Sequence, residues 1–146
     1  MKIVYPAILF DLDGTLVMSM ETKIKNAGQI WHERYGVTPE KVYAAYVSHS
    51  GVPRRQLFQA IGKETLNRNI SDDEYRSLST AFSERNIEVL CELPFVTGCE
   101  ALLSDLFSAG VNMGVSSSAE PDEVLARLKH RKEARFFQVI LGSRGS

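Results

Sequence analysis

A chain of 146 residues with 44% hydrophobic side chains and a formal charge of −1 has the size and composition of an ordinary globular domain. This charge gives no reason to expect a nucleic-acid partner. A signal peptide or membrane span does not fit the first residues, because their apolar run is interrupted by Pro6 and ends at Asp11. These features predict a cytoplasmic protein. Cys91 and Cys99 form neither a zinc-site pattern nor a disulfide framework.

The first predicted element is a strand that leads into two carboxylates. The segment AILFDLDGTLV, residues 7–17, runs from an apolar stretch into Asp11 and Asp13. A short apolar run bounded by polar turn residues is typical of a buried strand. Because ligand sites of open α/β sheets lie at the carboxyl ends of the strands, the motif is predicted to lie where such a sheet carries its chemistry.

Helical patterns dominate the next part of the chain, from about residue 18 to residue 92. Helices are predicted over residues 20–35, 39–48 and 53–61. Ser71 and Glu74 have the spacing of a capping box, which predicts a further helix beginning near Asp72.

After Leu93 and Pro94 the pattern alternates between helix and strand. The helical faces are Leu102, Leu103, Leu106 and Phe107, and then Val124, Leu125 and Leu128 after Pro121. The strands are predicted over residues 111–115 and 136–141. Alternation of this kind indicates a parallel sheet covered by helices.

The sequence therefore predicts an α/β fold with two units. A Rossmann-like parallel sheet core, incomplete at the C-terminus, is predicted to consist of residues 1–17 and 93–146. An all-helical cap, residues 18–92, is predicted to be inserted after the first strand. An incomplete sheet would expose an unpaired edge, which favours self-association.

The two carboxylates of DLDGT restrict the chemistry. A calcium loop needs an acidic or amide residue at its fifth position and glycine at its sixth. Counted from Asp11, these positions hold Thr15 and Leu16, which excludes a calcium loop. A nucleotide-binding glycine-rich turn is disfavoured, because the motif holds one glycine and two carboxylates that would repel a phosphate. Two carboxylates around a tight turn at Gly14 can instead share a divalent cation while Asp11 or Asp13 attacks and the other moves a proton.

DLDGT after an apolar strand resembles the first motif of the haloacid dehalogenase superfamily, whose commonest members are magnesium-dependent phosphatases and phosphomutases. The helical insertion resembles the small cap of this superfamily, and VNMGVSSS, residues 111–118, lies at the place of its second motif. The resemblance implies that Asp11 is the nucleophile that forms an aspartyl-phosphate, and that Asp13 is the general acid and base. It implies that Mg²⁺ binds the Asp11 carboxylate and the Asp13 backbone carbonyl.

The same resemblance implies that Ser116 binds the phosphoryl group, with the backbone amide of Ser117 as a second donor near the next helix. An ordinary turn between strand and helix is the alternative interpretation of SSSAEP, residues 116–121. Asp13 distinguishes this chain from the dehalogenases for which the superfamily is named, because those enzymes lack this second aspartate. An alkoxide leaving group needs an acid to protonate it, and hydrolysis of a carbon–halogen bond has no such leaving group.

The family's third motif provides a lysine and its fourth provides acidic metal ligands, and these 146 residues have no position that matches either. The chain is therefore interpreted as truncated, and its activity alone is left open. Arg144 would follow the third strand and could bring a positive charge, although residues near chain ends are usually solvated.

Each of the other basic residues is predicted either to lie in solvent on the protein surface or to take part in the site. Arg54 and Arg55 begin a cap helix, where they either face the distal group of a substrate or lie in solvent. A solvated helix face is predicted for Arg127, Lys129, His130, Arg131, Lys132 and Arg135. Lys23 and Lys25 would suit imine formation in a phosphonate-cleaving enzyme, which Asp13 disfavours.

The sequence thus predicts a Mg²⁺-dependent phosphoric monoester hydrolase that acts on a small phosphorylated metabolite. The alternatives are a phosphomutase of the same superfamily and a non-catalytic, truncated fragment that keeps phosphate and metal affinity. Turnover that depends on both Mg²⁺ and Asp11 would separate the enzymes from the fragment.

Overall fold

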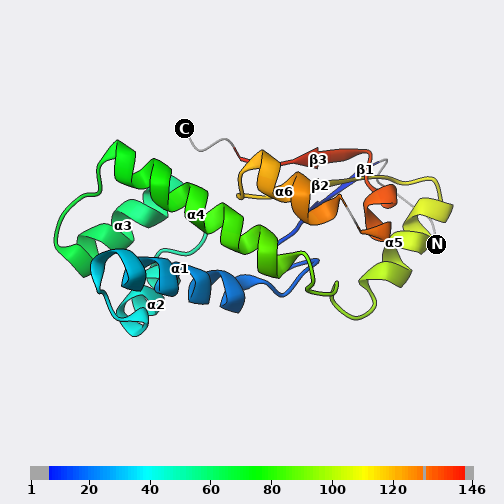
Figure 1. Ribbon diagram of the computed structural model, residues 1–146. Coiled ribbons are helices and arrows are strands. Elements are labelled where there is room, and N and C mark those ends of the chain that lie inside the picture. The colour runs from blue at the N-terminus through cyan, green and yellow to red at the C-terminus, as the bar shows by residue number, and fades with distance from the viewer. Residues whose placement is uncertain (1–6, 130, 144–146) are drawn as a thin grey trace.

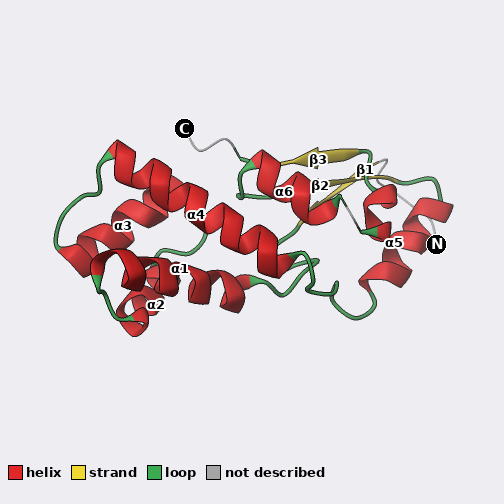
Figure 2. Cartoon of the chain, viewed as in Figure 1, coloured by secondary structure: helices red, strands yellow, loops and turns green. Residues whose placement is uncertain are grey.

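A computed structural model describes residues 7–129 and 131–143 and separates a group of helices from a small sheet (Figure 1). The elements are β1 (Ala7–Asp11), α1 (Met20–Tyr35), α2 (Pro39–Ser48), α3 (Arg54–Leu66), α4 (Asp72–Leu90), α5 (Cys99–Ser108), β2 (Asn112–Ser116), α6 (Pro121–Leu128), a 3-10 helix (Lys132–Phe136) and β3 (Val139–Leu141). Figure 2 shows α1 to α4 at one end of the molecule and the strands with α5 and α6 at the other. This arrangement confirms the predicted α/β fold with an inserted helical cap.

The described strands form one parallel sheet in the order β1-β2-β3. Helices α5 and α6 contribute to the core on one face, where Ile8 and Phe10 of β1 pack. Leu9 points to the opposite face and is 60% exposed. The predicted burial of the first strand is therefore wrong, because β1 is an edge strand among the described strands and only one of its faces is covered.

The third strand is shorter than predicted. Phe136 ends the 3-10 helix, and the strand itself is confined to Val139–Leu141. Phe136 packs edge-on against Phe107, with ring centroids 5.6 Å apart, and Phe137 packs against Phe10 at 6.4 Å. These aromatic residues, read as strand formers in the sequence, thus bury their rings in the core before the strand begins.

Two helix faces are narrower than the sequence predicts. In α5, Leu103 and Leu106 are buried, but Leu102 and Phe107 are each 49% exposed. In α6, Leu125 is likewise 49% exposed. Each helix buries only part of its predicted apolar face, so the outer apolar residues of both faces remain accessible to solvent.

The cap has its own aromatic core, separate from the core beneath the sheet. Phe58 of α3 lies at its centre, with ring centroids 4.8 Å from Trp31 and 5.4 Å from Phe82 in edge-to-face geometry. The capping box is confirmed: the Glu74 amide donates to Ser71 Oγ at 3.2 Å, and the Ser71 amide donates to Glu74 Oε2 at 2.8 Å. Two separate cores support the division at residues 18 and 92, which stays a prediction.

Helix α3 extends beyond its predicted end. The sequence predicts that this helix ends at residue 61, with Gly62 as the C-terminal stop, but the helix continues to Leu66 and is followed by Asn67 with a left-handed φ of 55°. Gly62 is instead a point of close packing, because a Cβ there would lie 2.8 Å from Ile70 Cγ2.

None of the helices in the described part of the chain is long and apolar enough to cross a membrane.

Gly62→Ala is expected to destabilise the cap. Overpacking costs about 1–3 kcal/mol and outweighs the gain of up to ~1 kcal/mol in helix propensity, so the free energy of unfolding should fall by about 1–2 kcal/mol. Urea denaturation followed by circular dichroism measures this change. Gln56→Ala, at an exposed position of the same helix, is the control. A Gly62→Ala variant as stable as the parent would contradict the close packing.

Candidate active site

The motif residues lie where the sequence placed them, at the carboxyl edge of the sheet. Asp11 is opposite Ser116 in the β1–β2 register, and Ser116 is opposite Leu141 of β3. Asp11 is exposed, and one of its carboxylate oxygens accepts a hydrogen bond from the Leu12 amide at 2.9 Å. The proposed nucleophile and the proposed phosphate-binding hydroxyl therefore end adjacent strands.

A tight turn after β1 positions Asp13. Gly14 has a φ of 81°, a left-handed conformation that favours glycine, and its amide donates to the Val17 carbonyl at 2.7 Å. The Leu16 and Val17 amides donate to the Leu12 carbonyl at 3.1 and 2.9 Å. This turn lets the chain reverse immediately after the motif and holds the Asp13 side chain beneath the cap.

Asp13 is held by charged and hydroxyl groups on several sides. Its carboxylate pairs with Lys23 of α1 at 2.8 Å and with both terminal nitrogens of Arg127 of α6 at 2.8 and 3.2 Å. Ser19 also donates to this carboxylate, and the Ser117 hydroxyl donates to it at 3.3 Å. Groups from the cap and from the core therefore meet at one carboxylate.

These contacts decide the charge of Asp13. Burial alone would raise the pKa of Asp13, but the Lys23 ammonium and the Arg127 guanidinium outweigh it and hold that pKa well below its usual range. Asp13 is therefore a carboxylate at neutral pH in this arrangement, the form that accepts a proton.

The predicted solvated helix face is wrong for its two most buried arginines. Arg127 has a side chain only 2% exposed, because α6 turns it towards Asp13. Arg131 is half-buried and donates to the carbonyls of Leu90, at 3.2 Å, and Cys91, at 2.9 Å, at the end of α4. Exposure is found as predicted for Lys129, Lys132 and Arg135. His130 and Arg144 lie outside the described residues.

Arg54 is also buried, at 7% exposure, which excludes the solvated alternative. Its guanidinium pairs with Glu123 of α6 at 2.5 Å, and donates to Ser83 at 2.7 Å and Ser79 at 3.2 Å. Arg55, by contrast, pairs with Asp72 at the surface. The sequence analysis did not single out Glu123, which the structure places between Arg54 and Arg127.

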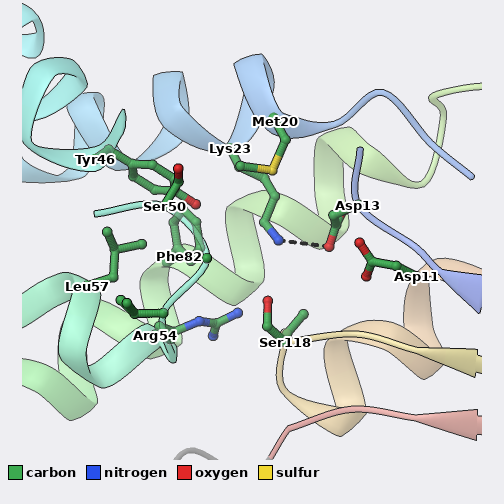
Figure 3. Close-up of a pocket in the computed structure, with 13 residues that line it drawn as sticks. Asp11, Asp13, Met20, Lys23, Tyr46, Ser50, Arg54, Leu57, Phe82 and Ser118 are labelled. Atoms are coloured by element: carbon green, nitrogen blue, oxygen red, sulfur yellow. Dashed lines mark hydrogen bonds and ion pairs between the residues drawn. The ribbon is translucent and has the colours of Figure 1, made fainter. Parts of the chain in front are cut away.

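A cavity of about 320 Å³ opens between the cap and the carboxyl edge of the sheet (Figure 3). Its walls include Asp11, Asp13 and Ser118 from the core and Met20, Lys23, Tyr46, Ser50, Arg54, Leu57 and Phe82 from the cap. Burial raises the pKa of Tyr46 to about 12, so that its hydroxyl remains neutral. The cavity thus joins the predicted nucleophile to a wall built from the cap.

The serines after β2 have separate roles. The Ser117 amide donates to the Leu141 carbonyl at 2.9 Å, so this donor is engaged within the sheet. Ser118 was not singled out in the sequence, yet it lines the cavity with Asp11 and a second hollow beside Ser116. The phosphate-binding role of Ser116 and Ser117 stays a prediction.

The oxygen atoms at the motif suit Mg²⁺. The Asp11 carboxylate is exposed, and the Asp13 backbone carbonyl would supply a second hard oxygen ligand. Mg²⁺ commonly binds one or two carboxylates and keeps several waters. Within residues 7–129 and 131–143, no cluster of three or more His, Cys, Asp or Glu side chains could form a closed metal cage. The residues present therefore fit an open magnesium site rather than a structural one.

A family model described as haloacid dehalogenase-like hydrolase matches residues 8–145. The chain belongs to this family. The match confirms the resemblance of DLDGT and its surroundings, and no curated protein matches the chain significantly.

Solved structures support the same fold. A structure described as a predicted phosphoglycolate phosphatase from Haemophilus somnus 129PT is similar, with a TM-score of 0.78 and 20% identity over 97% of this chain and 64% of that one. CbbY from Rhodobacter sphaeroides, solved with xylulose-(1,5)bisphosphate, has a TM-score of 0.69 and 19% identity over 94% and 63%. A predicted phosphatase from Clostridium acetobutylicum has a TM-score of 0.72 and 25% identity over 95% and 61%. The chain thus spans less than two thirds of the length of each of these three proteins.

Proposed function

We propose that this chain is the nucleophile-bearing part of a cytoplasmic, Mg²⁺-dependent phosphoric monoester hydrolase that acts on a small organic phosphate. The observation that carries the proposal is the exposed Asp11 carboxylate at the carboxyl end of β1. Asp11 lines a cavity together with Asp13, whose carboxylate is paired with Lys23. A helical cap from the same chain closes the other side of that cavity (Figure 3).

The proposed chemistry has two steps. The Asp11 carboxylate attacks phosphorus and forms an aspartyl-phosphate as the bond to the ester oxygen breaks. Asp13, a carboxylate in the free protein, takes a proton from the monoanionic substrate and gives it to the departing oxygen. Water then attacks the phosphoryl group and Asp13 takes its proton. The bond between phosphorus and Asp11 breaks, which releases phosphate and restores the Asp11 carboxylate. Bound Mg²⁺ would offset the repulsion between the carboxylate and the phosphate oxygens. In this proposal the hydroxyls of Ser116 and Ser118, which line hollows beside Asp11, would donate hydrogen bonds to those oxygens.

Hydrolysis of phenyl phosphate tests the proposal. We expect turnover that requires Mg²⁺ and is lost in Asp11→Asn, because an amide is a far weaker nucleophile than a carboxylate. Asp105→Asn, at an exposed position on α5, is the matched control and should retain the rate. Equal background rates in Asp11→Asn and the parent, both folded by circular dichroism, would instead identify a non-catalytic module.

We also propose that the chain associates with itself through β1. Among the described strands β1 is at an edge of the sheet, and exposed Leu9 of β1 lies with Val139 and Leu141 of β3 on the uncovered face of the sheet. Leu9→Lys should shift the population to monomer in size-exclusion chromatography with light scattering. Leu102→Lys, which adds the same charge on α5 away from that face, should not. A monomeric parent at high concentration would contradict this proposal.

A further inference from the structure

Arg54, the cation on the side of the cavity opposite Asp11, already pairs with a carboxylate. Arg54 extends from α3 into the cavity, on the side opposite Asp11 (Figure 3). One terminal nitrogen pairs with Glu123 Oε2 at 2.5 Å, and the other donates to Ser83 and Ser79. Its guanidinium is also stacked over the Phe82 ring, 5.1 Å from the centroid. Arg54 is therefore fixed in place and paired with a carboxylate before any substrate enters.

Glu123 is held as firmly as Arg54. Its side chain is fully buried, and it accepts hydrogen bonds from Ser83 at 2.9 Å and from Asn86 at 3.2 Å. A terminal nitrogen of Arg127 lies 3.7 Å from Glu123 Oε1, the oxygen that does not pair with Arg54. Removing either partner from a buried pair is costly, so a substrate anion would have to compete with a preorganised carboxylate for Arg54.

The rest of the cavity offers no uncompensated cation among its described lining residues. Lys23 pairs with Asp13 at 2.8 Å. The neighbouring walls are apolar at Met20 and Leu57, and Tyr46 presents a neutral hydroxyl. A second phosphate or a carboxylate on the substrate would therefore be desolvated here without a free positive charge, close to Glu123.

We infer that Glu123 is a specificity-determining residue, which restricts the site to phosphate monoesters whose alcohol part carries no charge. This inference rests on the proposed function, because it places the phosphoryl group at Asp11 and the alcohol part towards Arg54. The remaining N–H groups of Arg54 and the hydroxyls of Tyr46 and Ser50 suit neutral hydroxyl groups of such a substrate.

Two probes of nearly the same shape test this inference. 4-Carbamoylphenyl phosphate and 4-carboxyphenyl phosphate carry planar groups of similar size at the distal end, and only the carboxylate is charged. Their dissociation constants would be measured by titration calorimetry with Mg²⁺, in the Asp11→Asn background that prevents turnover. We expect the dissociation constant of 4-carbamoylphenyl phosphate to be at least about tenfold lower than that of 4-carboxyphenyl phosphate, because like charges in an interface are strongly disfavoured.

Glu123→Gln should reduce or reverse this preference, because it releases Arg54 for the added carboxylate. Asp122→Asn, an exposed charge on the same helix, should leave the preference unchanged. Should Glu123→Gln fail to fold, Arg54→Gln/Glu123→Gln removes both charges and should keep the parent's preference. If the parent binds the carboxylated probe more tightly, and the double variant loses this preference, then Arg54 receives anions and the inference is wrong.

Two further outcomes separate this inference from the proposed function. Binding of both probes with equal affinity by the parent would overturn the role of Glu123 while leaving a phosphate site in place. Binding of neither probe by any folded variant would overturn the proposed function, and the inference with it.

Discussion

Arg127→Met is expected to lower the free energy of unfolding by about 3–5 kcal/mol, the usual cost of removing one partner from a buried ion pair. Arg127 forms a bidentate pair with Asp13 and lies 3.7 Å from Glu123, with only 2% of its side chain exposed. Methionine replaces most of the aliphatic stem, so that the loss reports the charge and not a cavity. Urea denaturation followed by circular dichroism measures it.

Lys129→Met removes a positive charge from the end of the same helix at an exposed site and should change stability by less than about 0.5 kcal/mol. A double-mutant cycle of Arg127→Met with Asp13→Asn should show strong coupling, because Arg127→Met then leaves no charged Asp13 behind. Additive effects, or a loss below about 1 kcal/mol in Arg127→Met, would contradict the buried network.

Asp13→Asn should separate the two halves of the proposed reaction. Acetyl phosphate has a good leaving group, so Asp11 is expected to become phosphorylated without help from Asp13. Hydrolysis of the resulting aspartyl-phosphate should slow by about 10²- to 10⁴-fold, because no general base takes the proton from water. Intact-protein mass spectrometry over time would show the phosphorylated form accumulating in this variant and decaying in the parent.

Two controls keep this second prediction specific. Circular dichroism must show that Asp13→Asn is folded, because the substitution leaves Lys23 and Arg127 without their carboxylate. Asp105→Asn should behave as the parent does. Decay of the phosphorylated form at the parent's rate in Asp13→Asn would show that another group acts as the base.

Local sequence patterns were sufficient for much of the fold. The carboxylates of DLDGT follow an apolar strand and precede a glycine that permits the turn, so Asp11 could be placed at the sheet edge from the sequence. Ser71 and Glu74 satisfy each other's backbone groups within a single helical turn, which makes that helix start predictable without any tertiary contact.

The charge network could not be predicted in the same way. Glu123 and Arg127 lie four residues apart, a spacing that usually marks a solvated helix face. Their burial depends on the packing of α6 against α4, which carries Asn86 and Ser83 from a distant part of the chain. Only that tertiary contact turns two ordinary surface charges into the partners of Arg54 and Asp13.

Gly62 illustrates the same limit in the cap. A glycine near the end of an apolar helical pattern commonly marks a C-terminal stop. Here it allows Ile70 to approach the helix, a contact between segments that local pattern does not encode. The signal that ends α3 is the left-handed Asn67, five residues further on.

The most direct test of the account is whether Asp11 itself receives the phosphoryl group. The parent would be incubated with acetyl phosphate and Mg²⁺, reduced with borohydride and mapped by peptide mass spectrometry. We predict a Mg²⁺-dependent conversion of Asp11 to homoserine, the product of a reduced aspartyl-phosphate, and its absence in Asp11→Asn. Modification of other carboxylates alone, or none at all in the folded parent, would contradict the central role of Asp11.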